Sequence, residues 1–226
     1  MLDKLNVLQL GWQSAFATAN ATATKKLKDV SSFSLKPELE TRALQQLRGT
    51  LAPTHQTALD NYASSATFEA ADCSFEEVVY WLEMLFGTDS TPTGAGPYVR
   101  DYAAPTTAAV TPHFATLQFG QTGGIYQMQD ASVASLTLSG TNKGGVQVGG
   151  SLIGGKVIEG SLQALNDSTN DTRMTGCMAS VAVDPWSGTM GASVHQNTTF
   201  SWELSINSNR AYRSYLGSCT PTTYAD

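Results

Sequence analysis

Residues 200–207 read FSWELSIN, in which large apolar side chains alternate with small or acidic ones. Successive side chains of a β-strand point to opposite faces, so the pattern predicts a strand with one buried and one solvent-facing side. Asn207, Ser208 and Asn209 then supply turn-forming residues. The same two-residue period recurs at residues 33–40, 115–119, 134–139 and 179–183.

Glycine and proline divide these strands in a way that is typical of all-β proteins. The chain of 226 residues has 20 glycines and only 14% charged residues. Paired glycines within residues 144–158 predict strands that bend sharply. Pro37 cannot donate a hydrogen bond to a sheet, which places the strand at 33–40 on an edge or at a bulge. Roughly seven to nine strands joined by short turns are expected, as in β-sandwiches and barrels.

One helix is expected over residues 74–87. Ser74 and Glu77 form the two ends of a capping box, in which each side chain satisfies an exposed backbone amide. Three glutamates are expected on the solvated face of this helix: Glu76, Glu77 and Glu83. A single apolar stripe is expected to pack on a sheet face and consists of Phe75, Val78, Val79, Leu82, Leu85 and Phe86.

Charge and cysteine content exclude several classes of function. The formal charge of −6 argues against sequence-independent binding of nucleic acid, because such binding needs cationic side chains that neutralise phosphates. No run of 18 apolar residues exists, so no membrane-spanning helix is expected. Cys73, Cys177 and Cys219 are odd in number and widely spaced, which argues against a disulfide framework and a Cys-x-x-Cys metal site.

The sequence contains no recognisable catalytic constellation. Residues 150–157 match the Gly-x4-Gly-Lys of nucleotide-binding loops, but Val157 stands where a serine or threonine would bind magnesium, and no helix is expected to follow. A Gly-x-Ser-x-Gly nucleophile elbow is absent, and His55, His113 and His195 lack partners at metal-ligand spacing. We therefore expect no catalytic, cofactor-binding or metal site, and no enzymatic activity.

Residues 1–30 mix small side chains with a basic patch at Lys25, Lys26 and Lys28 and show no sustained period. They are expected to form an N-terminal arm rather than part of the core. Residues 31–226 are expected to form a single β domain.

Several stretches resemble the tail tube, or major tail, proteins of long-tailed bacteriophages. They are residues 11–16, 48–53, 66–69, 74–87, 92–98 and 136–140, so the similarity runs, with gaps, over most of the chain. The longest of these stretches is the helical segment SFEEVVYWLEMLFG at 74–87.

The resemblance implies a β-sandwich or half-barrel flanked by one helix, with six copies closing into a ring around a multi-subunit β-barrel. Rings of this kind stack around a tape-measure protein, meet tail terminator and distal tail proteins, and pass DNA through the lumen without binding it specifically. The expected location is the virion tail, after assembly in the host cytoplasm. A hairpin loop at residues 41–61 would contact the next ring, through Leu47, Arg48, Leu51 and Pro53.

Physical considerations agree with this expectation. Closing a sheet across subunits removes the unpaired edges that a half-barrel would present to solvent. A net acidic subunit also suits a conduit for DNA, because an anionic wall repels phosphate. The main alternative is a carbohydrate-binding or adhesive β-sandwich that uses Trp186 and Tyr212 as stacking platforms. An enzyme ranks third among the hypotheses.

Overall fold

In the computed structural model, most of the described residues form β-strands, and the described part of the chain contains one α-helix. The structure describes residues 7–18, 23, 25–45, 54–87, 102, 112–121, 123–161, 172–180, 182, 184–185, 188–189, 192–194, 200–215, 218 and 221–225. The elements are β1 (Val7–Trp12), β2 (Lys25–Lys26), β3 (Val30–Gln45), β4 (Thr54–Ala70), α1 (Phe75–Phe86), β5 (Ala115–Gln121), β6 (Gly124–Thr141), β7 (Gln147–Gly154), β8 (Val157–Glu159), the short 3-10 helix η2 (Gly176–Met178), β9 (Ser201–Asn207), β10 (Ala211–Arg213) and β11 (Thr223–Ala225).

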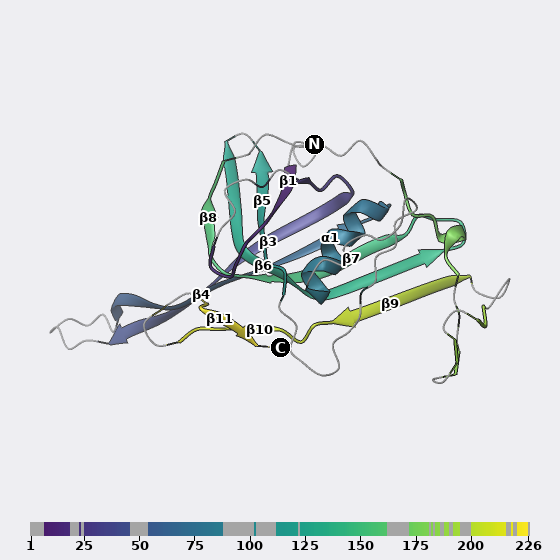
Figure 1. The fold of residues 1–226 in the computed structure, drawn as a ribbon. Helices are drawn as coiled ribbons and strands as arrows, with labels where there is room; N and C mark the ends of the chain where they lie inside the picture. Colours follow the sequence, from purple (N-terminus) through teal and green to yellow (C-terminus); the bar gives the residue numbers. More distant parts are fainter. Residues whose placement is uncertain are drawn as a thin grey trace.

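Strand β6 joins two parts of one nine-stranded antiparallel sheet. Up to Ala131 it pairs with β5 and β8, and the pairing continues from β5 to β1 and β2; we call this part sheet I. From Ser132 onwards it pairs with β7 and β9, and the pairing continues from β7 to β4 and β3; we call this part sheet II. Asp130, which lies next to this change of partners, has a φ of 54°. Figure 1 shows that β6 bends as it passes from one part to the other.

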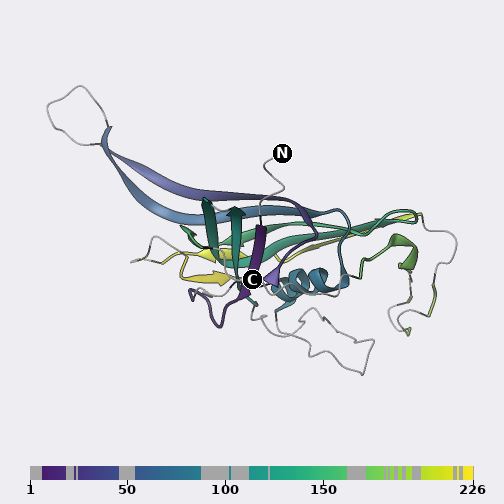
Figure 2. The same cartoon turned by 90° about the horizontal axis from the view of Figure 1, so that it is seen from above.

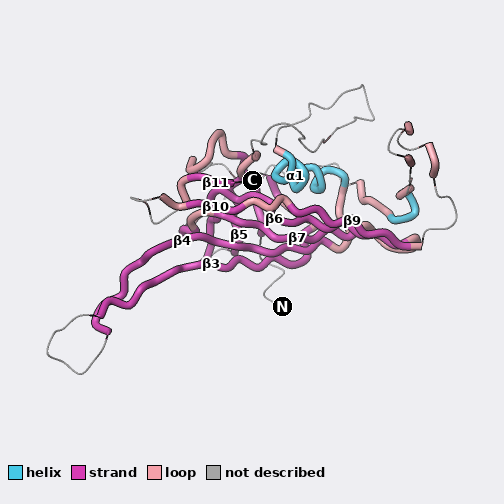
Figure 3. The backbone as a smooth tube through the Cα atoms, turned by 90° about the horizontal axis from the view of Figure 1, so that it is seen from below, coloured by secondary structure: helices cyan, strands magenta, loops and turns pink. Residues whose placement is uncertain are grey.

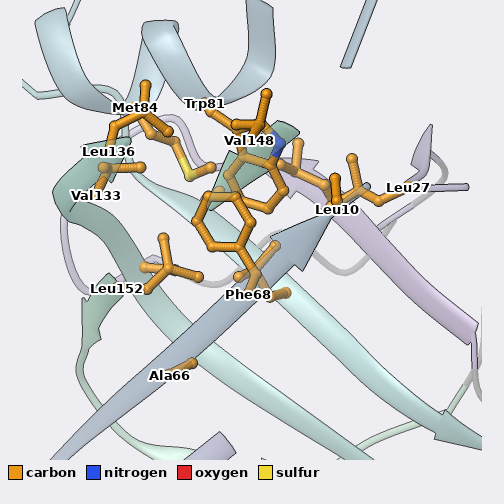
Figure 4. Packing of buried hydrophobic residues seen from close by; sticks show 14 of the residues in the cluster. Leu10, Leu27, Ala66, Phe68, Trp81, Met84, Val133, Leu136, Val148 and Leu152 are labelled. Carbon is orange, nitrogen blue, oxygen red and sulfur yellow. The ribbon is translucent and has the colours of Figure 1, made fainter. Parts of the chain in front are cut away.

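The hydrophobic core lies between the two parts of the sheet and helix α1. Phe68 on β4 stacks on Trp81 of α1 with ring centroids 3.8 Å apart. Leu10 joins the cluster from sheet I, and Leu136 joins it from sheet II (Figure 4). Burial of each side chain of this size stabilises the fold by about 1.5–3 kcal/mol.

Helix α1 has the predicted N-cap serine at its start and the predicted glycine at its end. The Ser74 hydroxyl accepts a hydrogen bond from the Glu77 backbone N–H over 3.3 Å. At the other end, Gly87 has a φ of 74° and donates its N–H to the carbonyl of Glu83 over 3.0 Å. Only one half of the predicted capping box forms, because the Ser74 N–H donates to the Asp29 carboxylate instead of to Glu77. The left-handed glycine forms the end of the helix.

The buried face of α1 is rotated from the predicted stripe. Val78 and Leu85 lie in the core, and Val79, Leu82 and Phe86 pack against it while remaining partly exposed. Phe75 is 50% exposed, which corrects the expectation that it faces the sheet. The most deeply buried positions are instead Trp81 and Met84, both at 0% exposure. The reason is the stacking of Trp81 on Phe68, which turns the helix about its own axis.

Two of the three helix glutamates also differ from expectation. Glu77 and Glu83 are buried, at 5% and 7% exposure, and only Glu76 is partly solvated. Glu77 is buried because its carboxylate accepts hydrogen bonds from the backbone N–H groups of Lys28 and Asp29. A contact with a segment nearly fifty residues earlier in the chain produces no periodic pattern in the sequence, so the burial of Glu77 could not be predicted.

The N-terminal residues differ from the arm expected over 1–30. Strand β1 lies inside sheet I, between β2 and β5, and its Leu8 and Leu10 belong to the core. The sequence did not predict a core strand here because the opposite face of β1 carries a polar residue, Gln9, which is fully buried. Gln9 lies opposite Gln118 on β5, and Gln118 donates to the Gln127 side chain over 3.0 Å. From one sequence alone, a polar residue that faces a second buried surface cannot be told from a polar residue that faces solvent.

Most of the other predicted strands are longer than predicted, whereas β9 begins one residue later than the predicted strand at 200–207. Strands β5, β6 and β9 contain residues 115–119, 134–139 and 201–206, and β3 lies at an edge of the sheet, as Pro37 predicts. Residues 144–158 contribute β7 and part of β8. No strand is described at 179–183, where Ala182 forms only an isolated bridge with Val194 and Val181 and Val183 lie outside the described residues.

Candidate assembly surface

Sheet II has one apolar face and one polar face, and the pairing register shows both. Residues paired across all five strands form an apolar row of Phe33, Phe68, Gly150, Leu136 and Ile206. The next row along the strands consists of Ser34, Thr67, Ser151, Ser135 and Asn207. Helix α1 lies on the side of the apolar face (Figure 2).

The polar face is a layer of hydroxyl groups that bond to one another across strands. Ser135 Oγ lies 2.6 Å from Ser151 Oγ, and Thr137 Oγ1 lies 3.0 Å from Ser205 Oγ. Up to the register shift after Glu40, the charged side chains that the pairing places on this face are Lys36, Glu38, Glu40, Glu69 and Glu203. Four acids and one base give this face an acidic balance.

Sheet II ends in two strands that each pair on one side only within the described chain. Strand β3 pairs with β4, and β9 pairs with β6. Leu204 on β9 is 51% exposed although it lies on the apolar face, and Phe200 just before β9 is 79% exposed. Long edge strands with exposed apolar side chains favour pairing with another chain.

Strands β3 and β4 extend beyond the sheet as a two-stranded ribbon. β4 pairs with β7 only from Ser64 onwards, so the rest of the hairpin has no third strand in the described residues. The ribbon projects away from the body of the molecule (Figures 2 and 3). Most of the loop predicted at 41–61 is therefore paired strand. The four expected contact residues, Leu47, Arg48, Leu51 and Pro53, lie outside the described residues.

A cluster of buried charges fixes the point where the chain enters β3. The Asp29 carboxylate accepts a hydrogen bond from the Ser74 N–H over 2.7 Å and forms an ion pair with Arg173. Burial away from water, followed by repulsion from Asp29, raises the pKa of Glu77 to about 7. Burial, followed by repulsion from the carboxylates of Glu77 and Asp29, raises the pKa of the Cys73 thiol to about 12. These contacts tie the base of β3 to the start of α1.

Arg210 anchors the segment that follows β9. Its guanidinium is buried and donates to the carbonyl oxygens of Met84 and Leu85, over 2.9 and 2.7 Å, and to the Ser132 hydroxyl. The cation thus satisfies carbonyl groups at the C-terminal end of α1 and interacts favourably with the helix dipole. No pattern in the sequence distinguishes Arg210 from a surface arginine, so sequence analysis did not find it.

Tyr212 does not provide the exposed platform that the carbohydrate-binding hypothesis requires. Its hydroxyl donates to backbone carbonyls of Asp130 and Ile153, and its ring lies 5.7 Å from that of Phe16. Burial raises the pKa of Tyr212 and also that of the Asp130 carboxyl, which accepts from the Ala17 N–H over 2.7 Å. The other proposed platform, Trp186, lies outside the described residues.

The remaining motifs are explained by the fold. Residues 150–157 run from β7 into β8, so the glycines that resemble a nucleotide loop lie between strands rather than before a helix. His113 stacks on Trp12 with ring centroids 4.0 Å apart. Among the described residues, no three His, Cys, Asp or Glu side chains gather closely enough to hold a metal ion.

The described helices include none that is both long enough and apolar enough to cross a membrane. No model of a protein family matches this chain, and a search of the curated proteins finds no similar sequence.

Proposed function

We propose that this chain is the subunit of a bacteriophage tail tube. Copies join through the edges of sheet II into a ring, the hydroxyl-rich face of sheet II lines the lumen, and stacked rings form a conduit for DNA. The main observation behind the proposal is that, among the described residues, sheet II has two edges without a further strand and one face without a covering helix. The resemblance to tail tube proteins supports six copies per ring.

The chemistry of the polar face supports a lumen for DNA. Hydroxyl groups such as those of Ser135 and Ser151 bond to each other, and they present no fixed cation to a passing phosphate. The acids Glu69 and Glu203 outnumber the cation Lys36 on the body of this face. Because an anionic wall repels phosphate, DNA would slide past without being held.

The β3–β4 ribbon supports contact between stacked rings. Leu59 is 44% exposed on this ribbon. Apolar side chains on a projecting hairpin are buried most simply against a neighbouring ring. In this proposal Leu47, Arg48, Leu51 and Pro53, which follow β3 in the sequence, contribute to the same contact. Tape-measure, tail terminator and distal tail proteins are the further partners, and the virion tail is the site of action.

Electron microscopy of the purified full chain tests the proposal. We expect rings or tubes in negative stain and fast-sedimenting species over a concentration series. A chain that stays monomeric at high concentration, and becomes more heat-stable when a sugar is added, would instead favour the carbohydrate-binding alternative.

A matched pair of variants makes the test specific. Leu204→Lys places a charge on the free edge strand β9 and is expected to prevent assembly, because edge lysines oppose strand pairing. Met178→Lys changes a side chain that is 71% exposed on η2, outside sheet II, and is expected to assemble like the wild type.

A further inference from the structure

The two edge strands of sheet II run in the same direction. Each neighbouring pair across the sheet, from β9 through β6, β7 and β4 to β3, is antiparallel. Four reversals separate β9 from β3, so the two edge strands are parallel to each other. The number of strands in sheet II therefore determines how one copy can meet the next.

Rotation about a ring axis preserves the direction of a strand along that axis. In a ring, the β9 edge of one copy meets the β3 edge of its neighbour, because head-to-tail contacts join two different surfaces. We infer that the subunits join through a parallel pairing of β9 of one copy with β3 of the next. This inference rests on the proposed ring. Two-fold pairing of like edges would be antiparallel and would give a closed dimer instead.

Barrel geometry limits the register of this junction. Within one copy, Ile206 is level with Phe33 across the sheet, which places Glu203 level with the start of β3. Strand tilts of 35–45° across five strands shift the neighbouring β9 by about five to seven residues along β3. Only a shift toward the hairpin keeps β9 beside β3, since β3 begins at Val30. This shift brings Glu203 to residues 35–37, of which Lys36 lies on the polar face.

The side chains favour the register that places Glu203 beside Lys36. Both side chains lie on the polar face and are exposed, and their charges are opposite. Opposite charges on adjacent strands stabilise a sheet, whereas like charges destabilise it. In the same register, Ser205 lies beside Glu38, so every polar residue of β9 meets a polar residue of β3.

The same register matches the apolar face. It places Phe200 beside Phe33, and Ile206 beside Leu39. Phe33 and Phe119 line a groove of about 930 Å³ next to the leading end of β3. Their rings lie 4.9 Å apart. The exposed Phe200 and Leu39 would thereby both lose contact with water at one junction.

Disulfide cross-linking of assembled particles tests the junction. In a full chain carrying Cys177→Ser and Cys219→Ser, we expect Ser205→Cys with Glu38→Cys to give a ladder of covalent multimers on oxidation. Each single substitution should give none. An intramolecular bond is excluded, because four strand spacings of about 4.8 Å separate β9 from β3 within one copy. Ser205→Cys with Ser151→Cys is the control, since Ser151 lies in the centre of sheet II.

A second cysteine pair determines strand direction. Parallel pairing predicts that Ser201→Cys also cross-links with Ser34→Cys, whereas antiparallel pairing predicts a cross-link with Arg42→Cys. Cross-links from Ser201→Cys to Arg42→Cys, or between like edges, would overturn the inference. So would particles that assemble without any β9–β3 cross-link, although the proposed function would survive that result. Failure of the wild-type chain to assemble would instead remove the proposed function itself.

Charge reversal tests the side-chain pair independently. Lys36→Glu is expected to raise the concentration needed for half-assembly by about 2- to 5-fold. Adding Glu203→Lys should restore the wild-type value. If the double variant assembles no better than Lys36→Glu alone, Glu203 does not lie beside Lys36, and the proposed register is wrong.

Discussion

Arg210 lies at the C-terminal end of helix α1, where its Nη1 donates a hydrogen bond to the carbonyl oxygen of Met84 over 2.9 Å. This contact joins the segment after β9 to a helix that lies more than a hundred residues earlier. The position of the β9 edge therefore depends on a buried cation as well as on the pairing of β9 with β6.

Replacing Arg210 should destabilise the subunit. Arg210→Ala leaves the carbonyl groups of Met84 and Leu85 without this donor, and we expect a loss of about 2–4 kcal/mol in the free energy of unfolding. Denaturant unfolding at neutral pH measures the effect. Arg213→Ala is the control, because Arg213 is exposed on β10. Equal stability of the two variants would show that the guanidinium contributes little.

The aromatic stack in the core should be the largest single contribution from side-chain packing. Phe68→Ala removes the ring that contacts Trp81, and we expect a cost of about 3–5 kcal/mol because of the cavity that remains. Thermal unfolding followed by circular dichroism measures it. Tyr126→Ala, which removes an aromatic ring that is 51% exposed, should cost far less. Comparable losses would contradict the central position of Phe68 in the core.

The buried Glu77 should make stability depend on pH. Its folded-state pKa of about 7 lies above the ordinary value of 4.5. Folding therefore favours the protonated form, and the stability from this group is present below about pH 4.5 and lost as the pH rises through 7. The loss is at most on the order of 3 kcal/mol.

Glu77→Gln should flatten this part of the pH profile. Urea unfolding between pH 5 and pH 8 measures the change, and Glu76→Gln on the partly solvated side of α1 is the control. The interpretation fails if the wild type gains stability between pH 5 and pH 8 while Glu77→Gln does not.

Gly140 should be required for the packing of β9. A Cβ atom at this position would lie 2.8 Å from the Trp202 ring, whereas a Cβ at Gly149 would have no neighbour closer than 3.5 Å. Gly140→Ala is therefore expected to displace Trp202, to cost about 1–3 kcal/mol and to weaken assembly through β9. Gly149→Ala is the matched control. Tryptophan fluorescence and sedimentation measure both effects, and identical behaviour of the two variants would contradict the expected displacement.

The sequence predicts those parts of the fold that depend on local patterns. Residues 201–207 and 115–121 form strands because their alternation requires a two-sided sheet, and Ser74 and Gly87 begin and end the helix through bonds within one turn. The N-terminal strand β1 could not be found in this way, because Gln9 is buried on its second face. The rotation of α1 toward Trp81 was equally hidden, since both sides of the helix carry apolar residues.

The sequence by itself determined that this protein is mainly β, with one capped helix and with strands that have small polar side chains on one face. Those features follow from side-chain periods of 2 and 3.6 residues, which are local properties of the chain. Only the tertiary structure decided that β9 forms the other edge of sheet II, that β9 and β3 run parallel, and that Glu77, Asp29 and Arg210 are buried. Strand order and the burial of charged side chains arise from contacts between segments that are distant in the sequence, and no local pattern of residues predicts such contacts.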